Sequence, residues 1–103
     1  MNKGEFIDRL SDKTGLTKKE ARGLLDSVLG LIQDTLLRGE DVKLVGFGKF
    51  AVRARKASSR INPQTKRPIQ VAAKVVPVFK PGKELKRQVD KTLKVTGSGV
   101  ARK

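Results

Sequence analysis

The chain has 103 residues, of which 24 are Lys or Arg and 10 are Asp or Glu, so its formal net charge is +14 at pH 7. This length favours one domain rather than two. Cysteine and histidine are both absent, which excludes disulfides, thiolate metal sites and histidine-based catalysis. No apolar run approaches the roughly 20 residues of a membrane span, and the first residues do not resemble a signal peptide. We therefore expect a small, soluble, intracellular basic protein that uses no cofactor or metal and is not an enzyme.

The positive charge is concentrated in the middle of the chain. Residues 1–41 are close to neutral, whereas residues 42–83 contain 11 basic and no acidic side chains. Cations at this density repel one another, and a polyanionic partner would neutralise them while it releases its own condensed counterions. The alternative is a basic surface that serves only solubility, but solubility does not require that every acid be excluded. The pattern therefore favours a polyanion as partner.

Two helices are expected in the first part of the chain. Asn2 is followed three residues later by a glutamate, as at an N-cap, and this pair predicts a helix over about residues 3–13. Thr17 and Glu20 repeat the pattern before a longer helix over about residues 18–38. Nearly all apolar residues of the second helix lie in an arc of about 160°, which is wider than the usual stripe that faces one core. This helix therefore needs neighbours on more than one side.

The hydrophobic period changes from helical to alternating after the second helix. Alternating apolar residues predict strands over about residues 42–44 and 50–52, joined through a tight turn at Gly46-Phe47-Gly48. Alternation returns over residues 69–79, where Pro77 indicates an edge strand or a bulge. These segments are expected to form a small antiparallel sheet.

A long polar segment separates these strands. Residues 53–68 contain six basic side chains and one large apolar one, Ile61, so they cannot join a core. Asn62-Pro63-Gln64-Thr65 has the composition of a turn, and the segment is expected to project as a hairpin, the β-arm. A basic two-stranded ribbon is thin enough to enter a nucleic-acid groove, whereas the alternative is a surface loop without a partner. The candidate contacts are Arg53, Arg55, Lys56, Arg60, Lys66 and Arg67.

The last part of the chain predicts a short helix and a tail. Apolar residues spaced four apart indicate a helix over about residues 83–93. Residues 94–103 contain Gly97-Ser98-Gly99 and are expected to be a flexible basic tail. The resulting α+β fold is one domain over residues 1–93, in which residues 1–38 form a helical dimerisation part. Because the β-arm leaves few residues for a core, we expect two identical chains to share one.

Other kinds of site are weaker candidates. The four Phe residues lie at periodic or turn-flanking positions, which indicates core packing and leaves the β-arm without aromatic platforms for single-stranded bases. The Gly46-Phe47-Gly48 segment lacks the longer glycine pattern of a nucleotide-binding loop. Eight of the ten carboxylates lie in residues 1–41, and the adjacent Glu40 and Asp41 would not converge on one metal ion. Catalytic and metal sites are therefore not expected.

Three separated motifs resemble the bacterial HU/IHF family of DNA-bending proteins. They are Gly46-Phe47-Gly48-Lys49-Phe50, Asn62-Pro63-Gln64-Thr65 and Pro77-Val78-Phe79-Lys80-Pro81-Gly82-Lys83. The resemblance covers residues 1 to about 90. It implies an intertwined dimer in which each chain wraps the minor groove of duplex DNA with one β-arm, and in which Pro63 at the tip partly unstacks a base step.

The resemblance also implies contacts outside the tip. Arg53 and Arg55 match basic arm positions that meet the minor groove. Four further residues match family positions on the body of the protein that face the flanks of the bent DNA, namely Lys3, Lys80, Lys83 and Lys86.

The chain departs from the family pattern within the arm. Ser58 stands where Arg is common, Lys66 where Gly is frequent, and Val75 where Lys is usual. Arg60 and Ile61 replace a small residue followed by Arg, and Ile61 beside Asn62 and Pro63 is expected to enlarge the wedge.

The sequence thus predicts a cytoplasmic, nucleoid-associated protein of the HU type that bends and compacts double-stranded DNA with little sequence specificity. Minor-groove readout is degenerate, which suits low specificity. IHF-like site preference and an RNA- or ribosome-associated role are the alternatives, and the lack of exposed aromatics disfavours the second. Binding to anionic membranes would need a basic amphipathic helix, but the charge lies on the strand region. Pairing with a paralogue rather than with itself stays open.

Overall fold

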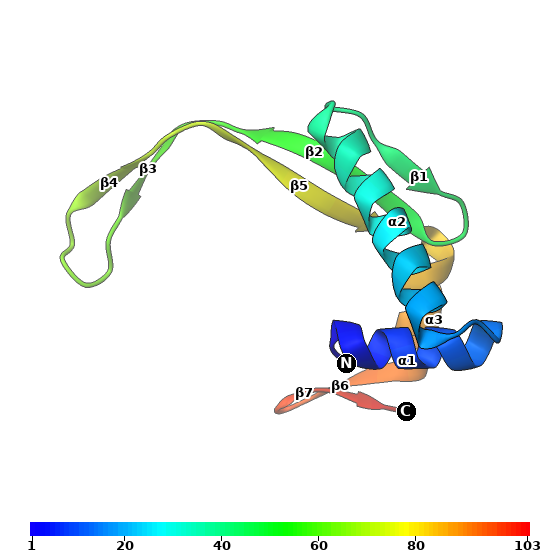
Figure 1. The fold of residues 1–103 in the computed structure, drawn as a ribbon. Coiled ribbons are helices and arrows are strands. Elements are labelled where there is room, and N and C mark those ends of the chain that lie inside the picture. Colours follow the sequence, from blue (N-terminus) through cyan, green and yellow to red (C-terminus); the bar gives the residue numbers. More distant parts are fainter. The chain divides into compact units, whose positions relative to one another are not determined.

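The computed structural model describes all 103 residues (Figure 1). The chain divides into two compact units, Met1–Arg38 and Gly39–Lys103. The first contains helices α1 (Lys3–Thr14) and α2 (Lys18–Leu37), and the second contains all the strands and the third helix. The predicted α+β class, with two N-terminal helices followed by antiparallel sheet, is confirmed.

Side-chain caps begin both N-terminal helices. The Asn2 side chain accepts a hydrogen bond from the Glu5 backbone N–H at 2.8 Å. At α2 the Thr17 hydroxyl accepts from the Glu20 N–H, and the Glu20 carboxylate accepts from the Thr17 N–H, both at 3.1 Å. These bonds satisfy N–H groups that have no partner within their helix. Gly15, at φ +76°, ends α1 in the left-handed conformation that glycine adopts without strain.

The first unit has little core of its own. Only Ile7 and Ala21 are buried in it. Two exposed ion pairs, Lys3–Asp26 at 2.7 Å and Lys18–Asp8 at 3.5 Å, contribute little to stability. Large apolar side chains of α2 remain exposed, namely Leu24, Val28, Leu29, Leu31 and Leu37. A helix pair that leaves this much apolar surface in water needs further cover.

The second unit is built on a three-stranded antiparallel sheet in the order β1-β2-β5. Its strands are β1 (Val42–Leu44), β2 (Gly48–Arg55) and β5 (Lys74–Pro81). Pro77 lies on the edge strand β5, as predicted, but it does not interrupt the strand, because β5 pairs with β2 on both sides of it. A residue without an N–H is tolerated there because an edge strand leaves part of its hydrogen bonds unmade.

Aromatic packing supports the start of β2. Ring centroids of Phe79 lie 4.9 Å from Phe50 and 5.4 Å from Phe47. A Cβ at Gly48 would lie 2.7 Å from both the Phe79 ring and the Lys80 carbonyl oxygen. Glycine is therefore required at position 48 because the two strands approach too closely there for any side chain.

The β-arm continues the ribbon of β2 and β5. Strand β3 (Ser58–Ile61) pairs antiparallel with β4 (Pro68–Val71). Residues 56–57 and 72–73 are unpaired between the two ribbons, and the chain bends there (Figure 1). The strand expected over residues 69–79 is therefore divided into β4 and β5.

The end of the chain differs from the sequence prediction. After α3 (Lys83–Thr92), strands β6 (Leu93–Thr96) and β7 (Gly99–Arg102) form an antiparallel hairpin. The flexible tail expected over residues 94–103 is thus replaced by paired strands, because Gly97 and Ser98 form a two-residue turn between them rather than a linker. Separately, none of the three helices is long and apolar enough to cross a membrane.

The capping box of α2 yields a first prediction. Thr17→Ala removes one of its two hydrogen bonds and should lower the free energy of unfolding by about 1 kcal/mol, measured by urea unfolding. The Thr17 N–H and then its hydroxyl hold the pKa of the Glu20 carboxyl below its usual value. Stabilisation of the ionised Glu20 is therefore complete above the unfolded pKa and is lost as the pH falls through the folded pKa.

The effect of Thr17→Ala should consequently shrink in acid, and NMR titration should show a higher Glu20 pKa in the variant. Lys19→Ala, an exposed change in the same helical turn, is the control and should leave stability within about 0.5 kcal/mol of the original. A pH-independent loss would contradict the coupling between the two residues.

Candidate nucleic-acid interface

Strand register gathers basic side chains on one face of the β1-β2-β5 sheet. Side chains alternate between the two faces along a strand, and residues that pair across strands share a face. Lys49 pairs with Lys43 on one side and Lys80 on the other, and Arg55 pairs with Lys74. The resulting surface, here called the cationic face, comprises Lys43, Lys49, Arg53, Arg55, Lys74 and Lys80.

The opposite face of the same three strands carries no charge. By the same alternation it holds Val42, Leu44, Phe50, Val52, Ala54, Val75, Pro77 and Phe79. This division explains why every second residue of β2 is basic toward its outer end. The uncharged face carries the aromatic side chains, whereas the charged face also holds the more buried Ala51, Val76 and Val78 and presents its exposed cations to a charged partner.

Like charges lie directly opposite one another on the cationic face. The pairs are Lys43–Lys49, Lys49–Lys80 and Arg55–Lys74, and such pairs destabilise a sheet. One acid compensates part of this charge, since the Asp41 carboxylate lies 3.7 Å from the Lys49 Nζ. The other five basic side chains of the face are exposed. A surface of this kind is stabilised when an anion binds to it.

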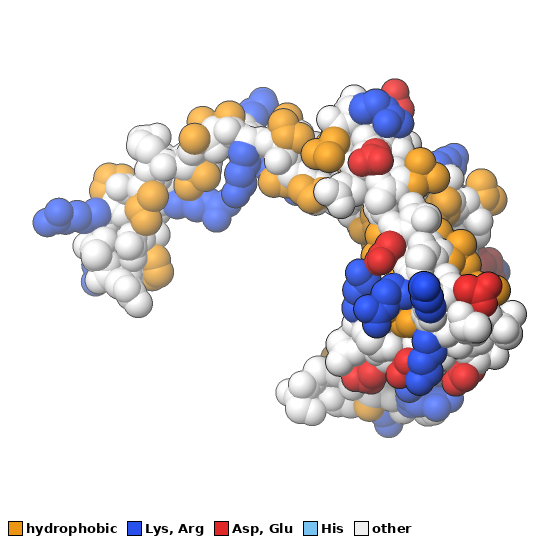
Figure 2. All heavy atoms as spheres, in the orientation of Figure 1, with side chains coloured by type: hydrophobic (Ala, Val, Ile, Leu, Met, Phe, Trp, Pro, Cys, Tyr) orange, Lys and Arg blue, Asp and Glu red, His pale blue; other side chains and the backbone are white.

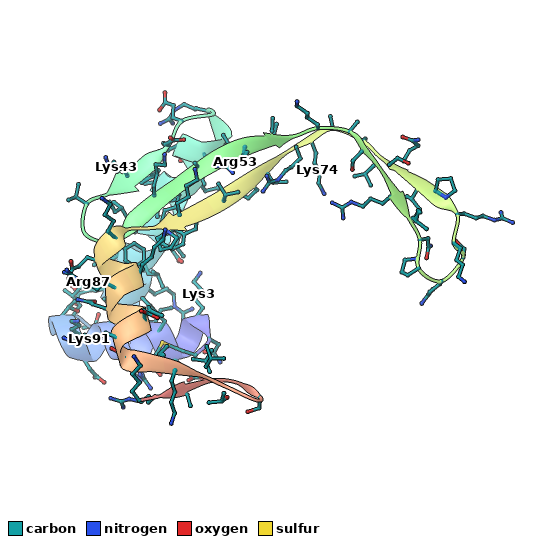
Figure 3. All side chains as sticks on the ribbon, turned by 180° about the vertical axis from the view of Figure 1, so that it is seen from behind. Lys3, Lys43, Arg53, Lys74, Arg87 and Lys91 are labelled. Atoms are coloured by element: carbon teal, nitrogen blue, oxygen red, sulfur yellow. The ribbon has the colours of Figure 1, made fainter.

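The figures show the same distribution. In Figure 3, Lys43, Arg53 and Lys74 follow one another along the sheet toward the bend of the ribbon. In Figure 2, several basic side chains lie along the inner side of the curved ribbon, and others project from its outer side. The cationic face thus continues from the sheet toward the arm.

The tip of the β-arm is a closed loop organised by Asn62. The Asn62 N–H donates to the Arg67 carbonyl at 2.9 Å, and the Asn62 carbonyl accepts from the Lys66 N–H at 2.7 Å. The Asn62 side-chain oxygen accepts from the Gln64 N–H at 2.9 Å. One residue therefore makes three hydrogen bonds that hold both sides of the tip together, so the predicted turn is ordered.

The tip presents both apolar and basic groups. Ile61, the last residue of β3, is 71% exposed, and Pro63 is exposed within the loop. Arg60 projects from the opposite face of β3, because neighbouring residues of a strand alternate. Lys56 lies in the unpaired segment before β3, and Arg67 closes the loop. Cations therefore accompany an exposed apolar pair along the arm.

Lys66 is the one residue other than glycine with a positive φ, at +57°. A residue with a Cβ is destabilised by roughly 1–2 kcal/mol in this conformation. The resemblance to a family with frequent Gly at this position marked Lys66 as a departure, and the backbone gives the physical reason for that preference. The chain therefore keeps a strained cation at the tip of the arm.

The remaining predicted contacts lie outside the cationic face. Lys83 and Lys86 are exposed in the first turns of α3. Lys3 belongs to the first unit, where its Nζ lies 2.7 Å from the Asp26 carboxylate. Its charge is thus already partly neutralised within that unit.

Three members of the cationic face were not among the predicted contacts. They are Lys43, Lys49 and Lys74. Counting alternate positions from Arg53 along β2 finds Lys49, but Lys43 and Lys74 are found only when the pairing register is known. No cluster of three or more acidic side chains capable of holding a metal ion occurs.

Comparisons with known proteins agree with this geometry. A family model described as bacterial DNA-binding protein matches residues 1–90. The chain is similar to DNA-binding protein HU of Thermotoga maritima, with 47% identity over 89 residues, covering 86% of this chain and 99% of that protein. It is also similar to HU of Thermus thermophilus, with 41% identity over 91 residues, covering 88% of this chain and 94% of that protein.

Solved structures show the same relationship. An Anabaena HU–DNA cocrystal structure has a TM-score of 0.80 and 40% identity, covering 87% of this chain and 98% of that chain. HU from Thermotoga maritima has a TM-score of 0.63 and 39% identity, covering 87% of this chain and 100% of that chain. The family match ends at residue 90, before the β6–β7 hairpin.

Lys66 provides a prediction about the tip. Lys66→Gly should relieve the left-handed strain and stabilise the closed loop by about 1 kcal/mol, which corresponds to about fivefold slower exchange of the Asn62 amide hydrogen. Lys66→Ala removes the same charge but keeps the strain, so it is the matched control and should not slow the exchange. Equal exchange rates in the two variants would show that strain does not limit the opening of the tip.

Proposed function

The chain belongs to the bacterial DNA-binding protein family, and on this premise we propose that it binds and bends double-stranded DNA as an architectural protein with little sequence specificity. The observation that carries the proposal is the cationic face, on which like charges are held directly opposite one another. A relative of similar fold, Anabaena HU, has been crystallised with DNA. DNA phosphates are the polyanion that these side chains fit.

Electrostatics accounts for affinity without sequence readout. Each basic side chain that meets a phosphate releases a condensed counterion, and this contribution does not depend on base sequence. The side chains that supply such contacts in this proposal are Arg53, Arg55, Lys56, Arg60, Lys66, Arg67, Lys80, Lys83 and Lys86, together with Lys3 where its ion pair opens. We add Lys43, Lys49 and Lys74, which share the cationic face with three of them.

Bending is assigned to the tip of the β-arm. Asn62 holds the loop closed, so Pro63 and Ile61 form a fixed apolar projection rather than a mobile one. An apolar side chain inserted between base pairs costs a few kcal/mol of stacking, and the bent duplex then contacts more of the protein. The curved ribbon with basic side chains on its inner side supports this arrangement (Figure 2).

The functional protein is proposed to be a homodimer. The buried hydrophobic residues of the chain are only Ile7, Ala21 and Ala51, whereas Leu31 and Leu37 are 67% and 77% exposed. A second copy that packs on α2 would cover this surface and would provide a second β-arm for the same duplex. Residues 1–93 then act as one DNA-binding domain, in the nucleoid and without a catalytic role.

A salt titration tests this function. Binding to intact, nicked and pre-bent duplexes, measured by gel shift, should weaken steeply with salt and should favour the distorted duplexes, because their deformation is already made. Arg53→Gln/Arg55→Gln should lower the slope of log K against log salt by about 0.9 for each phosphate that the variant no longer neutralises. Arg9→Gln/Lys13→Gln on α1 removes equal charge outside the proposed surface and is the control. Salt-independent binding of all three duplexes would reject the proposal.

The wedge has a separate signature. Ile61→Ala and Pro63→Ala remove apolar volume but no charge, so they should reduce the DNA bend angle more than the affinity. Fluorescence energy transfer between the two ends of a short duplex measures the angle, and Ser59→Ala, an exposed change on β3, is the control. An unchanged bend angle in both variants would assign bending to the cationic face alone.

A further inference from the structure

The hairpin of β6 and β7 is an ordered element that the family match does not cover. The match ends at residue 90, whereas the hairpin begins at Leu93. Its register runs from Leu93–Arg102 to Thr96–Gly99. The Lys103 N–H donates to the Thr92 carbonyl at 2.9 Å, which ties the end of the chain to the end of α3. The last residues therefore have a defined place next to that helix.

The hairpin and the last turn of α3 carry an excess of positive charge, with Asp90 as their one acidic residue. Residues 91–103 contain four basic side chains and no acidic one. They are Lys91, Lys94, Arg102 and Lys103, and all four are exposed. The ion pairs of this unit that involve Lys49 and Arg87 use none of them. These two ion pairs therefore leave the four cations available to a partner.

Helix α3 connects this charge to the DNA-binding surface proposed above. Lys83, Arg87 and Lys91 are spaced four residues apart and form a stripe opposite the apolar Leu85 and Val89. Figure 3 shows Arg87 and Lys91 one after the other along α3 toward the hairpin. From Lys83 to Lys91 the helix rises about 12 Å, along which a parallel duplex carries about seven phosphate charges.

We propose that the β6–β7 hairpin, with Lys91, is an additional phosphate-binding element that contacts duplex DNA beyond the part bound by the sheet and β-arm. The inference rests on the proposed function, because it assigns the hairpin to the same partner. DNA that leaves the cationic face and passes Lys83 meets Arg87 and Lys91 next and then the hairpin. The consequence is a longer bound duplex than residues 1–90 alone would hold.

An exposed apolar pair on the hairpin raises the alternative that a second copy of the chain binds there. Val95 and Val100 pair directly across the strands and are 90% and 69% exposed. Together with Val89 and Leu93 they line a shallow groove that a second copy could fill, and the charged Asp90, Lys94 and Lys103 complete its lining. Lys94 and Arg102 on the two strands oppose edge-to-edge pairing of like hairpins, since charged edges repel one another. The charges therefore favour DNA over a second hairpin.

The test compares duplex lengths. Lys94→Gln/Arg102→Gln/Lys103→Gln keeps the strands and removes three charges from the full chain. On a long duplex it should lower the slope of log K against log salt by about 0.9 for each phosphate left without its cation, and on a duplex just long enough for the sheet and arms it should change nothing. The shortest duplex that gives full affinity should also become shorter. Equal slopes for variant and original protein on long duplexes would overturn the inference.

Controls separate this inference from its premise. Arg9→Gln/Lys13→Gln/Lys19→Gln removes three charges from the helical unit and should not alter the dependence on duplex length. If the original protein binds no duplex, the proposed function itself fails, whereas binding with equal slopes rejects only the role of the hairpin. Sedimentation compares the assembly state of Val95→Thr/Val100→Thr with that of the original protein, and the two should be the same. If the original protein formed a larger assembly that this variant does not form, the hairpin would instead be assigned to contacts between copies.

Discussion

Repulsion among the basic side chains of the cationic face is the constraint on which the second unit depends. Neighbouring strands lie about 4.8 Å apart, which is shorter than the screening length of about 8 Å at physiological ionic strength. Salt therefore screens the repulsion between neighbouring strands only in part. Three like-charge pairs across strands therefore oppose the sheet, and Asp41 offsets part of the charge of Lys49, which belongs to two of them. Packing opposes this repulsion, since the Phe79 ring packs on Phe50 and Phe47 and Ala51 is buried. On the proposed function, bound phosphates remove the repulsion, so a cost to the free protein becomes part of the binding free energy.

The same alternation explains why the chain is incomplete alone. The face that holds the sheet together is itself partly open, with Phe79 41% and Val75 68% exposed. In the helical unit, α2 presents apolar side chains around too wide an arc for α1 to cover. Both observations have one physical cause, which is that the β-arm and hairpin take many residues out of a short chain. A dimer resolves this shortage, and it doubles the number of cations that one duplex meets.

The helices and the β-arm could be predicted from local sequence patterns, but the pairing of the strands could not. Asn2 and Thr17 mark helix starts because capping chemistry acts within four residues. The grouping of Lys43 with Lys74 depends on register between strands that are far apart in sequence, which no short pattern contains. The hairpin was missed for a different reason. Gly97-Ser98 is equally typical of a linker and of a two-residue turn, and only the valines on either side, which pair as Val95–Val100, favour the turn.

The arm combines an adaptable middle with a stiff end, and this order matters for a wedge. Residues 56–57 and 72–73 make no ladder pairs, so the ribbon is weakest there. The tip beyond is closed by the three hydrogen bonds of Asn62. A loop that changed its conformation on contact could not separate stacked bases. An arm that could not bend would fit only one groove geometry. On the proposed function, unpaired residues before the tip let the arm follow the groove while Pro63 and Ile61 keep their position in the closed loop. The left-handed backbone of Lys66 destabilises the closed tip. On the proposed function, the Lys66 side chain offsets part of this destabilisation by contacting the phosphates beside the kinked base step.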